Sequence, residues 1–250
     1  MANNKISGWI IFGLLFSVLA VVLLVLSGYG YQWGWWKLGT AFTWLLPGSI
    51  LLGLLGFIFG LIYWFARHRG MADGGEKGAW TAIILGLAVL GTVGYWFYQA
   101  NQFPPIHDIT TDTQHPPSFK NIVALRAGAA NDTAYGGSEI AQIQHKHYPD
   151  IQTLVMDAVY DETFNRALQA ARKQPWEKIV TSDRQAGLIE ASDKLPWFGF
   201  VDDIVIRIDS TANEGQTKID VRSVSRIGKG DIGVNAQRIR EYLDTIRTME

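Results

Sequence analysis

The sequence predicts a membrane-anchored α+β protein: three transmembrane helices, then a periplasmic antiparallel sheet with helices packed on one face. Long runs without charge fill the first hundred residues, and only five of the 22 basic and two of the 23 acidic residues precede residue 101. After residue 176, short segments alternate apolar and polar side chains as strands do. We therefore expect a three-helix anchor (1–100), a Pro-rich extended linker (101–119) and a soluble α+β domain (120–250).

Each of the apolar runs is long enough to cross a bilayer. They cover residues 8–28, 41–66 and 79–100 without any Asp, Glu, Lys, Arg or His, and each reaches the ~20 residues that a spanning helix needs. None has a polar face, which argues against three core helices of a soluble protein. A cleaved signal peptide fits poorly as well, because the first run is too long and two further spans follow it.

Basic residues in the loops predict the orientation of these spans. Lys5 precedes the first run, and Arg67, Arg69 and Lys77 lie between the second and third, whereas the loop between the first and second has only Lys37. Loops rich in basic residues stay in the cytoplasm, so the N-terminus is expected there and the C-terminal domain on the far side. In a bacterium this is a multi-pass inner-membrane protein with a periplasmic domain.

The spans themselves predict an anchor rather than a transport pathway, because they carry no ionisable side chain. Small residues that would let helices approach closely recur four positions apart: Gly13/Ser17, Gly56/Gly60 and Ala82/Gly86. This spacing predicts self-packing of the anchor or docking to a partner membrane protein. Pro47 is expected to mark a kink or an early turn of the second span.

The soluble domain is expected to order its elements as helix, four strands and helix. Apolar residues at helical spacing predict a helix over 162–174, with Asp157 or Asp161 as its cap, and a second helix over 235–249 capped by Asn235. Alternation predicts a meander of strands over 177–183, 187–193, 202–209 and 217–227. This order is typical of an α+β sandwich with helices on one sheet face.

The last two of these strands carry many charges. If they pair as a hairpin, Arg207 lies near Asp220, and Asp203 lies toward Val224 and Arg226. Opposite charges across strands stabilise by ~0.2–1 kcal/mol per pair. Asp203, Arg207 and Asp220 are therefore expected to form a salt-bridged, largely solvated face of the sheet, with a functional polar face as the alternative.

A glycine-rich turn follows the last predicted strand. Gly228, Gly230 and Gly233 lie next to a helix start, where backbone N–H groups can bind an anion. The surrounding side chains form a candidate anion- or partner-binding site of Arg222, Ser223, Ser225, Arg226, Lys229 and Arg238. The spacing is not that of a phosphate-binding P-loop, so nucleotide binding is not indicated.

Aromatic residues precede the third strand. Trp197, Phe198 and Phe200 are candidates for contact with the bilayer or an apolar ligand, and core packing is the alternative reading.

Several kinds of site are not predicted. His107 and His115 stand eight positions apart in a Pro-rich stretch, which is no standard ligand spacing, so no metal site is expected. The chain has no Cys, which removes disulfides and thiolate chemistry, and no cofactor motif. A formal net charge of -1 gives nucleic-acid binding no electrostatic support.

Several blocks of the sequence resemble a known bacterial family. They are "IHDITTD" followed by "PPSF", "IEA", "FGFVDDIVIR" and "IDVRSVSRIGKGDIGVNAQRIR", spread over residues 103–248. The family is a domain of unknown function, number fourteen ninety-nine of its series. The resemblance implies a small soluble or membrane-tethered module and transfers no catalytic residue.

Two classes of function remain open. The first is a non-enzymatic module whose periplasmic domain binds a partner protein or a lipid-like ligand, as an accessory or assembly factor of a membrane complex. Its partners would be the lipid bilayer and a membrane protein. The second is a periplasmic enzyme that acts on an anionic substrate through an Asp/Arg/Ser face. Convergence of those side chains in one concave pocket would favour the enzyme, and a flat salt-bridged face with an apolar groove elsewhere would favour the module.

Overall fold

The computed structural model describes residues 8–211, 213 and 215–249. The chain divides into two compact units. The first comprises Met1–Ala100 with Trp197–Gly199, and the second comprises Asn101–Pro196 with Phe200–Glu250.

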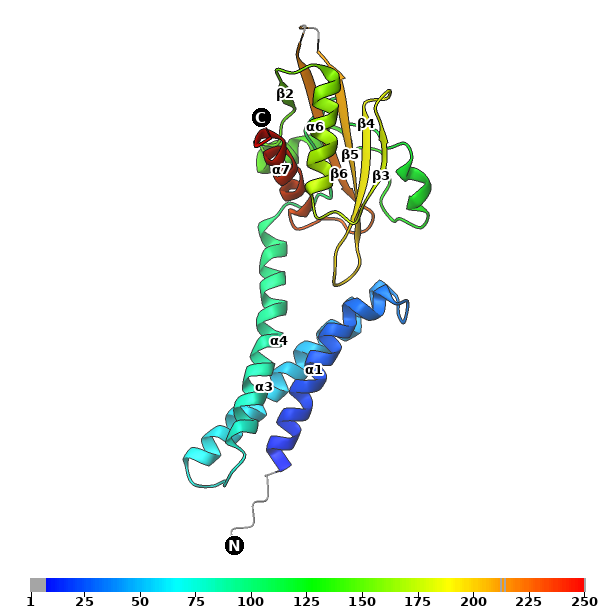
Figure 1. Ribbon diagram of the computed structural model, residues 1–250. Helices are drawn as coiled ribbons and strands as arrows, with labels where there is room; N and C mark the ends of the chain where they lie inside the picture. Colours follow the sequence, from blue (N-terminus) through cyan, green and yellow to red (C-terminus); the bar gives the residue numbers. More distant parts are fainter. Residues whose placement is uncertain (1–7, 212, 214, 250) are drawn as a thin grey trace. The chain divides into compact units, whose positions relative to one another are not determined.

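Within the described residues, three helical segments are long and apolar enough to cross a membrane. They are α1 (Gly8–Gln32), the continuous segment of α2 (Leu38–Thr40), η1 (Ala41–Leu45) and α3 (Leu46–His68), and α4 (Glu76–Gln102) (Figure 1). Each contains one of the predicted apolar runs. Pro47 lies in the first turn of α3, directly after the π-helical turn η1, and so marks the predicted early turn.

Small residues bring the helices of the first unit close together. A methyl group added at Gly56 would lie 2.0 Å from Ser17 Oγ, and one added at Gly86 would lie 2.6 Å from the carbonyl oxygen of Gly53. The Ser17 hydroxyl also donates a hydrogen bond to the carbonyl of Ala82 at 2.8 Å. The small residues singled out in the sequence therefore pack against one another within the anchor, which is the predicted self-packing.

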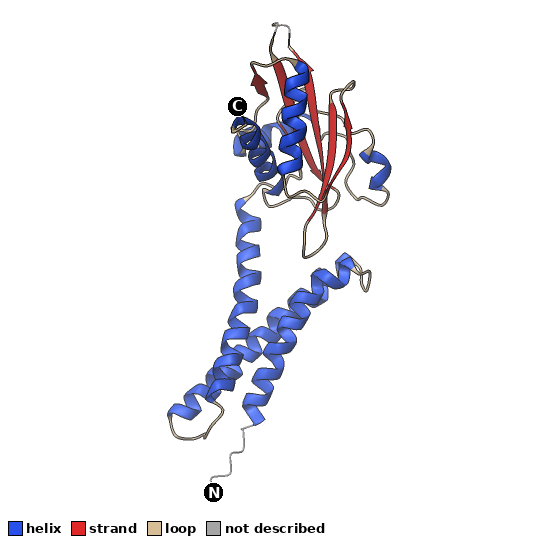
Figure 2. Ribbon diagram, viewed as in Figure 1, coloured by secondary structure: helices blue, strands red, loops and turns tan. Residues whose placement is uncertain are grey.

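The second unit is built on an antiparallel sheet that has six strands over its described residues, in the order β1-β6-β5-β4-β3, with β2 also beside β6 (Figure 2). The strands are β1 (Asp108–Thr110), β2 (Leu154–Met156), β3 (Lys178–Asp183), β4 (Leu188–Lys194), β5 (Val201–Ser210) and β6 (Thr217–Ser225). The four predicted strands form the meander from β3 to β6. β1 and β2 were not expected, because three residues are too few to show alternation. β1 lies within residues 101–119, so that segment is not only a linker but also contributes to the sheet.

Two helices cover one face of this sheet, as predicted. They are α6 (Tyr160–Lys173) and α7 (Val234–Arg247) (Figure 1). Ile204, Ile206 and Ile208 of β5 are buried in one apolar core with Phe164 of α6 and Ile239 of α7. Two further helices, η2 (Ile122–Arg126) and α5 (Gly137–His147), lie between β1 and β2 along the chain.

The caps of α6 and α7 differ from the prediction. Val159 precedes α6 and no side chain caps it. Asn235 is the second residue of α7 rather than its cap, and its side-chain amide donates to the carbonyl of His107 at 3.0 Å. Asp231 instead accepts hydrogen bonds from the N–H groups of Gly233 (2.9 Å) and Asn235 (2.8 Å). Gly233 takes the left-handed conformation that the turn requires, with φ at 77°.

The face opposite the helices is also buried, which the sequence did not predict. Residues 111–136, here called the covering segment, lie against it. Phe119 and Ile122 of this segment are buried in an apolar cluster with side chains of β4, β5 and β6. Glu190 of β4 is fully buried and accepts hydrogen bonds from the N–H groups of Lys120 (2.6 Å) and Asn121 (2.8 Å). The charged side chains of this face therefore lie under the covering segment rather than in solvent.

Candidate functional site

Charged side chains on the covered face of the sheet form a set of ion pairs. We refer to them as the covered charge network, which consists of Asp108, Arg126, Asp203, Arg207, Asp220, Arg222 and Arg226. The network contains five of the charged residues singled out in the sequence: Asp203, Arg207, Asp220, Arg222 and Arg226.

Arg207 and Asp220 pair across β5 and β6, as predicted, with Nη2 and Oδ2 at 2.7 Å. The expectation of a largely solvated pair is wrong, because Asp220 is fully buried. Its Oδ1 also accepts hydrogen bonds from the hydroxyls of Thr111 (3.0 Å) and Thr153 (2.5 Å). Asp220 therefore joins β6 to the residues that follow β1 and precede β2.

Arg222 is 2% exposed and fixes the covering segment. Its Nε and Nη2 donate to the two oxygens of Asp108 at 2.9 and 2.7 Å. Its guanidinium also donates to the carbonyls of Pro117 (3.1 Å) and Thr133 (2.8 Å). It lies 5.6 Å from the ring centroid of Tyr135, within range of a cation–π contact. An anionic ligand would have to displace Asp108 to reach this arginine.

Asp203 is buried between two arginines. Arg226 donates to both of its oxygens, from Nε at 2.9 Å and from Nη2 at 2.8 Å, and Asp203 is the register partner of Val224, both as predicted. Arg126 of η2 pairs with the same carboxylate. The sequence analysis missed Arg126 because η2 has no strand or helix periodicity that would place it beside β5.

The other candidates of the predicted anion site lie on the opposite face of the sheet, toward α7. Arg238 donates to Ser223 Oγ at 3.2 Å and to Asp202 at 2.9 Å. Ser225 Oγ accepts from the amide of Asn235 at 3.0 Å. The sheet therefore separates these side chains from the covered charge network, and the candidate residues do not converge on one site.

The glycine-rich turn after β6 is packed against the start of the second unit. A methyl group added at Gly230 would lie 3.1 Å from the Cα of Pro105, and one added at Gly233 would lie 2.5 Å from the ring of Phe103. Gly230 thus allows close approach of two backbone segments, and Gly233 leaves room for the Phe103 ring. Lys229 of the same turn has an exposed side chain.

The predicted aromatic candidates are divided between the units. Trp197 and Phe198 group with the first unit, where Trp197 Nε1 donates to the carbonyl of Val25 at 3.2 Å. Phe198 is 7% exposed, with its ring centroid 5.3 Å from that of Phe42. Phe200 groups with the second unit. The contacts of Trp197 and Phe198 are those of packed aromatic side chains.

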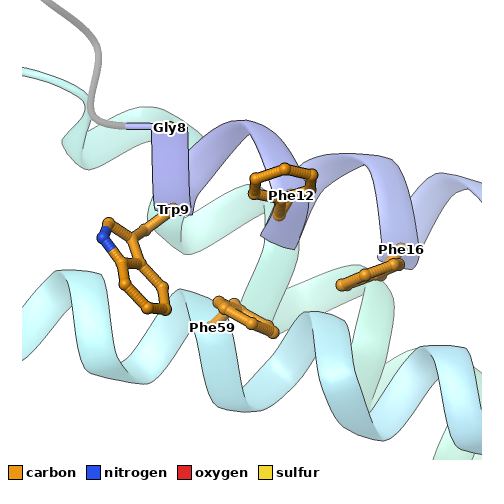
Figure 3. A pocket seen from close by; sticks show the side chains of 5 residues that line it. All are labelled: Gly8, Trp9, Phe12, Phe16 and Phe59. Carbon is orange, nitrogen blue, oxygen red and sulfur yellow. The ribbon is translucent and has the colours of Figure 1, made fainter.

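A shallow aromatic pocket of about 530 Å³ lies between α1 and α3 (Figure 3). Gly8, Trp9, Phe12 and Phe16 line it from α1, and Phe59 from α3. The rings of Trp9 and Phe59 stack with centroids 5.7 Å apart. Trp9 and Phe12 are 60% and 54% exposed, so the pocket is lined partly by apolar side chains on the outer surface of the helices.

A second pocket, of about 320 Å³, lies beside the covered charge network and is here called the β1 pocket. It is lined by His107, Asp108, Ala130, Asn131, Asp132, Ala134, Gly136 and Ile140. The sequence analysis weighed His107 only as a metal ligand. Residues 8–211, 213 and 215–249 contain no group of three or more His, Cys, Asp or Glu that could hold a metal ion.

Tyr135 adjoins the wall of the β1 pocket in sequence, between Ala134 and Gly136. Burial and the nearby Asp108 raise the pKa of Tyr135 to about 12, against the opposing effect of the Arg222 guanidinium. Its hydroxyl is buried and has no hydrogen-bond partner in the part of the chain that the structure describes. A buried hydroxyl without a partner is uncommon in folded proteins.

Comparison with known proteins identifies a family and nothing further. Residues 108–246 match the model of the family described as "Protein of unknown function (DUF1499)", which confirms the resemblance found in the sequence. No curated protein and no solved structure matches the chain. The match extends over more than half of the chain, from β1 to the last turn of α7.

Proposed function

The chain belongs to the DUF1499 family, and we propose that it is a membrane-anchored binding module rather than an enzyme. Its three apolar helices span the bacterial inner membrane with the N-terminus in the cytoplasm. Its α+β domain lies in the periplasm and binds a lipid-like ligand or a partner protein as an accessory or assembly factor. The anchor, the loops and the covered face of the sheet each support a part of this proposal.

Tryptophan spacing supports membrane insertion of the helices. Trp44 and Trp64 are separated by 20 residues of continuous helix, which is about 30 Å at 1.5 Å per residue. That length matches the hydrocarbon core of a bilayer, and tryptophan prefers its two boundaries. Trp44 is 72% exposed and Trp80, near the start of α4, is 45% exposed. Arg67 in the last turn of α3, Arg69 in the loop and Lys77 in the first turn of α4 make this connection basic, which favours its retention in the cytoplasm.

The covered charge network is the observation that carries the choice of a binding module. Asp203, Arg207 and Arg222, which an enzymatic face would have to offer to substrate, each hold the covering segment or a neighbouring strand. Removing one partner of a buried ion pair costs about 3–5 kcal/mol. A substrate that recruited these groups would therefore unfold the structure that positions them.

The β1 pocket is a concave surface of the second unit that lies beside the covered charge network and can take a ligand. It begins at His107, five residues after α4 ends at Gln102. A chain of five residues spans at most about 18 Å, so the pocket is tied close to the end of a predicted spanning helix. This position suits a ligand that comes from the membrane.

The test is to purify the full chain in mild detergent and identify bound lipids and proteins by mass spectrometry, with a variant that fills the pocket. Ala134 is exposed and lines the β1 pocket, whereas Ala124 is exposed on η2 and does not. We expect a ligand or partner retained by the native chain and Ala124→Trp but lost from Ala134→Trp, with equal thermal stability. The same bound molecules in all three proteins would contradict the proposal.

The orientation has a separate test. A reporter that is active only outside the cytoplasm, fused after residue 250, should be active in cells. Activity of a cytoplasmic reporter at that position instead would contradict a periplasmic domain.

A further inference from the structure

The hydrogen-bonding side chains that line the β1 pocket offer acceptors. His107 Nδ1 lies 3.3 Å from the carbonyl oxygen of Lys229. A carbonyl can only accept, so this nitrogen carries the hydrogen and Nε2 of the neutral ring is an acceptor. Asn131 donates both of its amide hydrogens, to the carbonyls of Ser225 (3.0 Å) and Gly228 (2.8 Å). Its side chain can therefore offer a ligand only its carbonyl oxygen.

Carboxylates add negative charge to this wall. Asp132 is exposed, and one of its oxygens accepts from the N–H of Ala134 at 2.7 Å. Its other oxygen has no hydrogen-bond partner among the residues that the structure describes. Asp108 contributes a second carboxylate, whose charge is balanced by Arg222. Neither Lys nor Arg is among the described residues that line the pocket.

The remaining lining is apolar and the space is small. Ile140, Ala130 and Ala134 supply aliphatic surface. A volume of about 320 Å³ is at the lower end of the range of ligand pockets. The ligand is therefore a small group that combines hydrogen-bond donors and positive charge with a short hydrocarbon part.

We propose that the β1 pocket binds the primary ammonium group of a small organic amine. An ammonium group has three donors and no acceptor, which matches a wall that offers acceptors from His107, Asn131 and Asp132. The methylene groups next to the ammonium lie against Ile140. This inference rests on the proposed function and gives its ligand a chemical class, opposite in charge to the anion expected from the sequence.

An ethanolamine headgroup of a membrane lipid and a free alkylamine in solution both carry this group. The first experiment tests whether the pocket binds an ammonium group, and the second tests whether that group belongs to a lipid or to a free amine.

The first experiment titrates ethylammonium chloride into the full chain in phosphatidylcholine nanodiscs and follows binding by calorimetry or saturation-transfer NMR. Asp132→Asn keeps an oxygen for the Ala134 N–H and removes only the charge, so ethylammonium should bind about tenfold or more weakly. Asp244→Asn is the matched control, because Asp244 is an exposed aspartate of α7 that pairs with Arg247. Its affinity should equal that of the native chain. Absence of ethylammonium binding, equal binding by Asp132→Asn, or preferential binding of acetate would overturn the inference.

The second experiment repeats the titration in nanodiscs that contain phosphatidylethanolamine. A lower apparent affinity for ethylammonium in these discs assigns the lipid headgroup as the ligand, because the lipid then competes for the pocket. An unchanged affinity assigns a free amine. If the Ala134→Trp capture experiment succeeds while ethylammonium fails to bind, the amine inference is wrong and the proposed binding function stands.

Discussion

The two faces of the sheet in the second unit are buried by different means. On one face, Ile204, Ile206 and Ile208 pack against α6 and α7, and apolar burial is non-directional and proportional to area. On the other face, an apolar cluster with Phe119 and Ile122 is joined by ion pairs and backbone hydrogen bonds that hold a mostly irregular segment, and these polar interactions depend on geometry and on both partners being present. The helix face therefore depends mainly on filled apolar volume, whereas the covered face also depends on both partners of each ion pair being present.

The largest effect should come from placing a charge in the helix face. Ile206 is fully buried, so Ile206→Asp introduces an unpaired carboxylate and should lower the free energy of unfolding by about 5 kcal/mol or more. Ile206→Val, which removes one methylene group, should cost only about 0.5–1.5 kcal/mol. Hydrogen exchange of the β5 amides in the full chain measures both. Unchanged protection in Ile206→Asp would show that Ile206 is not buried in the apolar core.

A slightly smaller loss should follow when the covered face loses one partner. Arg222→Met leaves Asp108 buried without its cation and should cost about 3–5 kcal/mol. Proteolysis should then cut first within the covering segment, while α6 and α7 stay protected. The double variant Arg222→Met/Asp108→Leu should recover much of the loss, since it leaves no unpaired charge. Equal stability of the single and double variants would remove the contrast between the faces.

A third test uses pH at the rim of the covered charge network. Burial raises the pKa of Asp112, but the N–H groups of His115 and Gln114 and the Arg207 guanidinium outweigh it and hold that pKa below its ordinary value. Asp112 therefore contributes stability above about pH 4, and this contribution is lost as the pH falls through the lowered folded-state pKa. Asp112→Asn should be less stable than the native chain at neutral pH, by about 1 kcal/mol or less. The difference should vanish in acid. A difference that persists in acid would mean that the charge is not responsible.

The smallest effect is expected at Tyr135. Its hydroxyl has no partner among the described residues, so Tyr135→Phe removes an unsatisfied polar group and should leave stability unchanged or raise it by about 1 kcal/mol. Thermal unfolding of the full chain provides the measurement. A loss of more than about 1 kcal/mol would show that the hydroxyl is hydrogen-bonded in solution.

Elements with a long or regular pattern were predictable from the sequence. The apolar runs predicted α1, α3 and α4, and alternation predicted β3 to β6. The pairs of Arg207 with Asp220 and of Asp203 with Arg226 were also predictable, because a single hairpin brings them together. In each of these cases the information is local in the chain.

The missed features depend on contacts between distant residues. Arg222 and its partner Asp108 are separated by 114 positions, and Arg126 and Asp203 by 77. β1 is three residues long and shows no pattern of its own. The pairing of Asp108 with Arg222 also turns the predicted anion-binding arginine into a structural one. The acceptor-rich β1 pocket arises from segments around residues 107 and 130–140, which no spacing rule connects.

The pairing of β1 with β6 has a consequence for the order of biosynthesis. Asp108 is the register partner of Val224 and Thr110 that of Arg222. The first strand to be synthesised, β1, can therefore pair only after the last strand, β6, has been synthesised. The covering segment has no docking surface until β4, β5 and β6 exist. A chain released before residue 217 would therefore lack β6, the strand that pairs with β1, β2 and β5. The sheet can be completed only after residues 217–225 have been synthesised, so folding of the second unit depends on its C-terminal residues.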